Sequence, residues 1–231
     1  MTRLRSASGV GPRVAPWLIA TALLSACAAR PVPPDWQANA KAAMDDAMAA
    51  HLRGEQRLED TAFTRAQSEL ARSGRLELMA RAELMRCAVR VASLSFEPCD
   101  GFEQLRIDAA AAERAYADYL AGRPLAPEDV QRLPSAQQAV AARLNQERAP
   151  VQQLQDIEDP LSRLIAAAVL FHAGKADPGT ITLAADTASA QGWRRPLLAW
   201  LQVQALYADK SGAADEAQRL WRRIERVSQG R

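Results

Sequence analysis

The sequence contains few of the residue types on which enzyme active sites depend. Among its 231 residues are only two histidines, His51 and His172, and they lie far apart in the chain. A zinc-protease motif needs two histidines four residues apart, and a serine triad would have to use one of these two. We therefore assign no catalytic residue and no metal site from the sequence, and an enzyme is the less favoured interpretation.

Closely spaced glycines are absent as well. After residue 26, no two glycines lie closer together than Gly174 and Gly179. Loops that bind nucleotide phosphates place their glycines in tighter patterns, such as GxGxxG. The sequence therefore gives no sign of a cofactor.

The apolar run at 14–24 is too short to cross a bilayer, which needs about 20 apolar residues. Arg3, Arg5 and Arg13 precede the run, and small residues separate it from Cys27. Positive charge, a short apolar stretch and small residues are the three parts of an export signal. We therefore expect residues 1–26 to be a signal peptide.

The residues that close this run, Leu24-Ser25-Ala26-Cys27, resemble the lipobox of bacterial lipoproteins. The resemblance implies cleavage before Cys27, a diacylglyceryl group on its thiol and acylation of the new amino terminus. Several acyl chains anchor a protein firmly to a bilayer. Residues 27–34 would then be the lipidated cysteine and a proline-rich tether. The alternative is an ordinary secretory signal that is cleaved after Ala26 or Ala29.

The residues after Cys27 bear on where such an anchor would lie. In lipoproteins, an aspartate at this point tends to retain the protein at the inner membrane, whereas here Ala28 and Ala29 follow. We expect anchoring to the outer membrane, with the chain on the periplasmic face.

Net charge gives no reason to expect a nucleic acid partner. Of the 29 Lys and Arg residues, three lie within residues 1–26, and this leaves 26 basic against 27 acidic side chains. Nucleic acid binding needs a concentrated basic face. We expect no nucleic acid partner.

Cysteine usage agrees with an oxidising compartment. If Cys27 carries lipid, Cys87 and Cys99 remain as an even pair, and we predict a disulfide between them. The alternatives are two free buried cysteines or a redox pair, and the redox pair lacks the close Cys-x-x-Cys spacing.

From Asp35 onward the patterns are helical. We predict one helix from Asp35 to about Leu52 and a second that ends near Gly74. Between residues 78 and 94, apolar residues recur at three- and four-residue steps over so broad a face that this helix is expected to be central. Another helix precedes Gly122.

Three later helix starts carry capping signals. Ser135 with Gln138 forms a capping-box pattern, and Asp159-Pro160 and Asp177-Pro178 each place a cap before a proline at the first helical position. Residues 180–183 have strand character but follow one of these caps, so we predict helix there. The sequence therefore indicates an all-α fold.

A weak internal repeat marks the carboxy-terminal part. A shift of 36 residues aligns Pro160 with Pro196, Leu161 with Leu197, Leu164 with Trp200, Ile165 with Leu201, Leu170 with Leu206 and Phe171 with Tyr207. The period is near that of tetratricopeptide-like repeats, but two copies are too few for a stable solenoid. We expect region 35–147 to complete the core of region 151–231, as one domain. The predicted architecture is antiparallel helical hairpins packed as a right-handed, tetratricopeptide-like or irregular α-α array.

Three stretches resemble a group of uncharacterised predicted lipoproteins of beta-proteobacteria. They are 86–94 (RCAVRVASL), 115–122 (AYADYLAG) and 186–201 (DTASAQGWRRPLLAWL). The likeness runs from the lipobox to the carboxy terminus, and it implies no activity.

Few polar residues stand out as candidates. His51 and Glu55 are four residues apart and can share a helix face as metal ligands, but two ligands are half a site, and a solvated helix surface is preferred. We interpret His172 as a surface residue at a helix terminus rather than a base. Four carboxy-terminal arginines are interpreted as a solvated helix face, namely Arg219, Arg222, Arg223 and Arg226.

The candidate interaction surface is Trp193-Arg194-Arg195, in the turn between the two repeat units. Tryptophan and arginine are frequent at the energetic centres of protein interfaces. Tryptophans at helical junctions more often fill the core, so core packing is the preferred interpretation of Trp193 and the interaction surface is the functional candidate. We expect an outer-membrane-anchored module that binds an envelope protein or helps to maintain the envelope. The alternatives are a periplasmic cell-wall hydrolase and a structural lipoprotein without a fixed partner.

Overall fold

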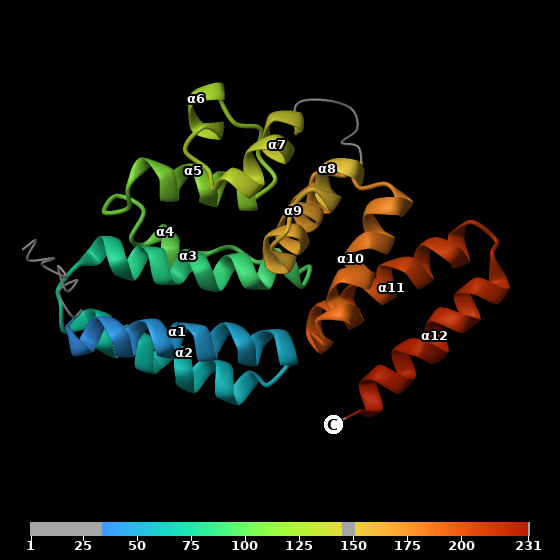
Figure 1. Ribbon diagram of the computed structural model, residues 1–231, viewed down its shortest axis with the longest axis horizontal. Helices are drawn as coiled ribbons and strands as arrows, with labels where there is room; N and C mark the ends of the chain where they lie inside the picture. Colours follow the sequence, from blue (N-terminus) through green and yellow to red (C-terminus); the bar gives the residue numbers. More distant parts are fainter. Residues whose placement is uncertain (1–33, 145–150, 231) are drawn as a thin grey trace, which may run out of the picture. The chain divides into compact units, whose positions relative to one another are not determined.

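The computed structural model describes residues 34–144 and 151–230, so Cys27 and most of its tether lie outside the described residues. All regular elements in these ranges are α-helices, and the all-α prediction is confirmed (Figure 1). No helix within the described ranges is both long and apolar enough to cross a membrane. The helices are α1 (Asp35–Arg53), α2 (Gln56–Ala71), α3 (Leu76–Ala92), α4 (Asp100–Glu103), α5 (Ala111–Leu120), α6 (Pro127–Val130), α7 (Ser135–Arg143), α8 (Val151–Gln155), α9 (Pro160–His172), α10 (Pro178–Ala190), α11 (Arg194–Lys210) and α12 (Ala214–Gln229).

Helices α1 and α2 form a hairpin whose two members lie side by side along α3 (Figure 1). Gly54 ends α1 in the left-handed conformation, with φ of 80°, and the next amide, of Glu55, donates to the carbonyl oxygen of Ala50 at 2.9 Å. Glycine adopts this conformation without steric cost, so the chain reverses within two residues. The hairpin and α3 enclose a small core around Phe63, Met44 and several alanines.

The third helix is central, as its broad apolar face predicts. It contacts α1, α2, α4, α5 and α9. Leu84, Val89 and Ala92 are all buried. At its end, Leu94 takes a φ of 60° and the amide of Ser95 donates back to the carbonyl oxygen of Arg90 at 3.0 Å. This arrangement satisfies carbonyl groups that the helix end would otherwise leave unpaired.

Two of the predicted caps form and one does not. Asp159 accepts from the amide of Ser162 at 2.7 Å, and Asp177 accepts from the amide of Thr180 at 2.6 Å. The predicted capping box at Ser135 is wrong, because Pro134 occupies the N-cap position and the amide of Gln138's side chain donates to the carbonyl oxygen of Leu133 instead. Residues 180–183 are helical, as predicted.

Helices α9 to α12 pack in sequence, each against the next (Figure 1). Fully or almost fully buried alanines are frequent in α9, α10 and α11, so small side chains make up much of what these helices bury. These alanines are Ala166, Ala167, Ala168, Ala184, Ala185, Ala188 and Ala205. The indole of Trp200, on α11, is also fully buried and donates to the carbonyl oxygen of Ala92 at 3.2 Å, which joins α11 to the end of α3. The tetratricopeptide-like arrangement itself stays a prediction.

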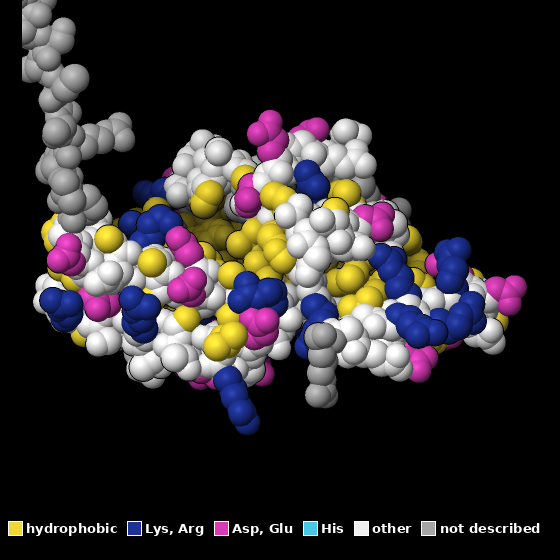
Figure 2. Space-filling model, turned by 60° about the horizontal axis from the view of Figure 1, so that its bottom comes forward, with side chains coloured by type: hydrophobic (Ala, Val, Ile, Leu, Met, Phe, Trp, Pro, Cys, Tyr) yellow, Lys and Arg dark blue, Asp and Glu magenta, His cyan; other side chains and the backbone are white. Residues whose placement is uncertain are grey.

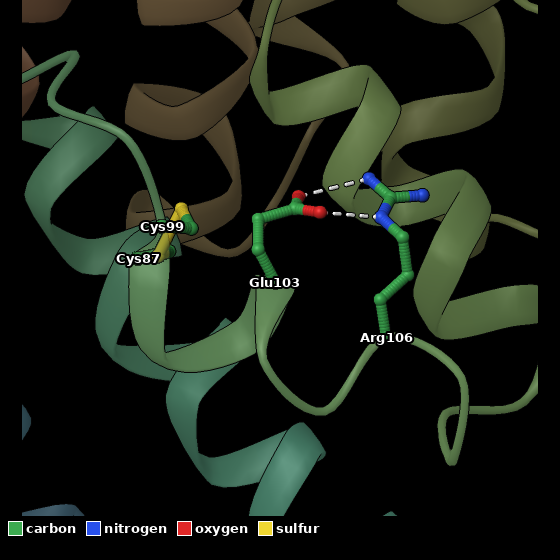
Figure 3. The surroundings of a disulfide bond; sticks show 4 residues. All are labelled: Cys87, Cys99, Glu103 and Arg106. Carbon is green, nitrogen blue, oxygen red and sulfur yellow. Dashed lines mark hydrogen bonds and ion pairs between the residues drawn. A yellow bond between two sulfur atoms is a disulfide. The ribbon is translucent and has the colours of Figure 1, made fainter.

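Cys87, on α3, is joined by a disulfide to Cys99, which immediately precedes α4 (Figure 3). The two Cα atoms are 5.9 Å apart, within the usual range for disulfides. Beside the bridge, the guanidinium of Arg106 donates to the carboxylate of Glu103 at 2.7 Å (Figure 3). The disulfide therefore holds the connection between α3 and α5 against the central helix.

We predict that removing this disulfide lowers the free energy of unfolding. The Cys87→Ser/Cys99→Ser double variant should lose about 3 kcal/mol, because the bridge closes a short loop and restricts the unfolded chain. Urea denaturation of the oxidised protein and of the double variant measures the difference. A reductant should destabilise the parent protein and leave the double variant unchanged, and equal stability of the two proteins would contradict the prediction.

Candidate functional site

The most distinctive polar cluster of the described residues is buried where α1, α2 and α3 meet. His51 and Glu59 are each 1% exposed and Ser93 is 8% exposed. The Nδ1 of His51 lies 2.9 Å from a carboxylate oxygen of Glu59, and its Nε2 lies 3.2 Å from the hydroxyl of Ser93. Because an ionised carboxylate only accepts, Nδ1 carries the hydrogen of the first bond.

Three arginines surround the carboxylate of Glu59. Arg86 and Arg90, on α3, each approach its Oε1 to 3.6 Å, and Arg195, on α11, approaches its Oε2 to 3.7 Å. Burial alone would raise the pKa of Glu59. The hydrogen bond from His51 and the nearby positive charges outweigh burial, so that the pKa of this carboxyl group is lowered from its ordinary value.

The order serine, histidine, carboxylate is that of a hydrolytic triad, but the surroundings differ from those of an active site. A triad works on a substrate that reaches the serine and needs amide donors for the developing oxyanion. Here all three residues are almost inaccessible. The amides of Leu94 and Ser95 are already bonded to the carbonyl oxygens of Val91 and Arg90. The cluster is therefore built as a junction between helices.

The interpretation of His51 as a solvated surface residue is wrong, since it is buried and pairs with Glu59, while Glu55 pairs with Arg53 at 2.7 Å. The sequence contains a signal for this arrangement. His51 continues a stripe of apolar residues at steps of four, three and four, which are Ala40, Met44 and Ala47. Glu59 starts an equivalent stripe on α2, made up of Phe63, Ala66 and Leu70. A polar residue in the core-facing stripe of each helix indicates a buried pair.

His172 is the last residue of α9 and is exposed, as expected for a helix terminus. Its ring stacks on that of Phe96, with the ring centroids 4.1 Å apart. His172 and Phe96 also line a cavity of about 220 Å³ beside the disulfide.

The structure places Trp193, Arg194 and Arg195 at the start of α11, partly buried rather than exposed. Arg194 donates to the carbonyl oxygen of Gly230 at 2.9 Å, and Arg195 donates to the side-chain oxygen of Gln56 at 2.9 Å. Trp193 packs against the main core. Both arginines thus bind within the chain and link α11 to the α1–α2 hairpin and to the end of α12.

A shallow groove of about 200 Å³ lies along α10, α11 and α12. Ile181, Tyr207 and Leu220 contribute apolar lining, and Gln204 contributes an amide whose buried Oε1 has no hydrogen-bond partner. Tyr207 and its neighbour Leu206 are 51% and 52% exposed. We call Leu206, Tyr207 and the exposed Trp221 of α12, together with this groove, the carboxy-terminal surface.

The internal repeat shows that the exposure of Leu206 and Tyr207 is unusual. Their equivalents in the first unit are Leu170, which is fully buried, and Phe171, which is partly buried and contacts the rings of Phe96 and Trp200. Leu206 and Tyr207, by contrast, are about half-exposed. The four carboxy-terminal arginines lie along one side of α12. In the view of Figure 2, Lys and Arg side chains gather at the end of the molecule where α12 lies.

Comparison with known proteins gives no match: no protein-family model, no curated protein and no solved structure is significantly similar to this chain.

We predict that Glu59→Gln lowers the free energy of unfolding by about 3 kcal/mol near neutral pH, because it removes the buried carboxylate that His51 and three partly buried arginines face. Since the pKa of Glu59 is lowered in the folded protein, its stabilising effect is complete above the pKa of an unfolded glutamate, about 4.3, and is lost as the pH falls below that value. The stabilities of variant and parent should therefore converge in acid. Denaturation curves from pH 3 to pH 7 measure this.

Glu55→Gln is the matched control, because Glu55 pairs with Arg53 at the surface of the same hairpin. It should leave the stability almost unchanged, because exposed ion pairs contribute little to folding. If the free energies of unfolding of Glu59→Gln and of the parent differ by the same amount from pH 7 down to pH 3, the assigned role of this carboxylate is contradicted.

Proposed function

We propose that the mature chain is a lipid-anchored envelope protein of the outer membrane, on the periplasmic face, and that its carboxy-terminal surface binds a protein partner. The observation that carries the proposal is the exposure of Leu206 and Tyr207 at positions whose repeat equivalents are covered. Large apolar side chains grouped at a surface are typical of interaction sites.

The chemistry of this surface suits a protein partner. Tyr207 and Trp221 combine a large apolar area with a polar group, and such residues dominate the binding energy of many interfaces. Gln204 lines the groove with its side chain, whose amide nitrogen donates to the hydroxyl of Thr182 at 3.2 Å. The indole of Trp221 is already held by Asp209 at 3.1 Å, so its orientation is fixed before binding.

Arg194 and Arg195 support the surface from behind. They connect the start of α11 to Gln56 and to the end of α12, and so fix the two helices that carry the exposed residues. The turn singled out in the sequence is thus proposed to position the binding surface rather than to supply its centre.

The contacts among Ser93, His51 and Glu59 favour a second candidate, a serine-dependent hydrolase of the periplasm. The burial of all three residues weighs against it. A fluorophosphonate probe separates the two candidates, because covalent labelling of Ser93 that is abolished in His51→Ala would favour the hydrolase.

We predict that Leu206→Glu combined with Tyr207→Ala weakens partner binding by at least about thirtyfold, the effect of losing residues at the centre of an interface. The measurement is recovery of partners crosslinked in intact membranes. Both residues are half-exposed, so the melting temperature should change little.

Ile107→Glu is the control, since Ile107 is 90% exposed and lies on the segment between α4 and α5. Equal partner recovery from the double variant and from the Ile107→Glu control would place the binding surface elsewhere.

The proposed anchor has its own test. Mass spectrometry of the mature amino terminus should show an acylated Cys27, because the lipobox ends at this residue. A Cys27→Ser variant should leave the membrane fraction, and an unacylated parent chain would refute the anchor.

A further inference from the structure

A second, larger groove lies where the described chain begins. It has a volume of about 500 Å³, within the range of sites that bind small molecules. Its walls come from the first turns of α1, the end of α2 and the start of α3. Trp36, Met44, Leu70, Leu78 and Met85 supply its apolar lining.

The lining is suited to a flexible hydrocarbon chain. Met44 and Met85 are unbranched, polarizable side chains that adapt to the shape of a ligand. Trp36, Leu78 and Met85 are only partly buried and pack at the edge of the small core between α1, α2 and α3. The groove is therefore an opening into that core, with side chains that can move aside.

The charges at the groove are already paired. Lys41 donates to Asp45 at 2.5 Å, and Arg81 pairs with Glu113 of α5 at 2.5 Å. Both cations are exposed, and each already has a carboxylate partner. The groove itself offers mainly apolar lining, which suits the hydrocarbon of an acyl chain whose head is an uncharged ester or amide, the linkages of an acylated cysteine.

The position of the groove identifies the source of such a chain. Trp36 and Gln37, which form part of the wall, lie two and three residues after Pro34, and Cys27 lies seven residues before Pro34. Seven residues reach at most about 24 Å. A ligand held by so short a linker has an effective concentration near the millimolar range, far above that of a free lipid in water.

We propose that this groove binds one acyl chain of the lipid attached to Cys27 of the same molecule. The groove shields that chain from water whenever the protein is outside a bilayer, and the chain returns to the bilayer when one is present. This inference rests on the proposed lipid anchor.

The test uses the chain that starts at Cys27, purified with its disulfide intact. Cys87 and Cys99 are bridged, so Cys27 is the sole thiol available for coupling to a maleimide that carries a dibrominated hexadecyl chain. Bromine quenches nearby indoles. We expect emission of Trp36, obtained as the difference between the parent and Trp36→Phe, to fall at least twofold and independently of protein concentration.

Several controls make the result specific. Leu78→Glu should abolish the quenching, whereas Leu58→Glu, which makes the same change at an exposed position of α2 outside the groove, should retain it. A dibrominated hexyl chain should quench less than the hexadecyl chain, and this comparison holds even if Leu78→Glu fails to fold. Free dibromostearate at the same concentration tests the other source of acyl chains and should quench Trp36 less than a tenth as much.

The proposal is overturned if the attached chain quenches Trp36 no more than the free acid, if quenching rises with protein concentration, or if Leu78→Glu leaves it unchanged. Because the chain is attached chemically, these outcomes do not depend on acylation in the cell. Failure of the anchor would instead appear in the mass of the mature amino terminus.

Discussion

The carboxylate of Glu59 is the group on which the arrangement of the helices most depends. It is buried on α2, yet it is approached by His51 of α1, by Arg86 and Arg90 of α3, and by Arg195 of α11. A charge in this position is tolerated only if its partners stay in place. The three amino-terminal helices and the carboxy-terminal array therefore have one common electrostatic centre, and a shift of any of these helices would leave charge unpaired in the interior.

This centre also explains how two rather different packing regions hold together. The α1–α2 hairpin and one side of α3 enclose a small apolar core, separate from the large core that α3 forms with the later helices. Between the hairpin and α11, the contacts described are mostly polar, including the bond from Arg195 to Gln56. Apolar burial stabilises each region, while hydrogen bonds with defined geometry determine how the hairpin is oriented on the rest.

The sequence predicts those parts of the fold that depend on near neighbours. Asp159 and Asp177 cap helices because their carboxylates reach amides three residues away, and Gly54 and Gly122 end helices through their own backbone conformation. The Ser135 cap fails because the preceding residue, Pro134, already occupies the N-cap position. Local rules of this kind hold until a neighbouring residue competes for the same position.

The stripes of α1 and α2 indicate that His51 and Glu59 are buried, but the complete cluster forms only when distant parts of the chain meet. His51 and Glu59 are eight residues apart, on two helices joined by a tight turn, and Ser93 is 42 residues from His51. Arg195 pairs with Gln56, 139 residues away, and no local pattern around Arg195 indicates this contact. Leu206 and Tyr207 are exposed because other parts of the chain leave this side of α11 partly uncovered. The sequence of α11 alone does not indicate this.

The buried alanines of α9, α10 and α11 give this protein an uneven tolerance to sequence change. Backbones that approach over methyl groups gain dispersion energy from many close atom pairs, without large side chains to interlock. A smaller side chain at such a position removes little volume, whereas a larger side chain finds no space. Evolutionary drift toward larger residues at positions such as Ala167 or Ala184 would push whole helices apart, whereas the bulky positions around Trp200 admit exchange among residues of similar volume. The smallest side chains of the core are thus expected to be its most restricted positions.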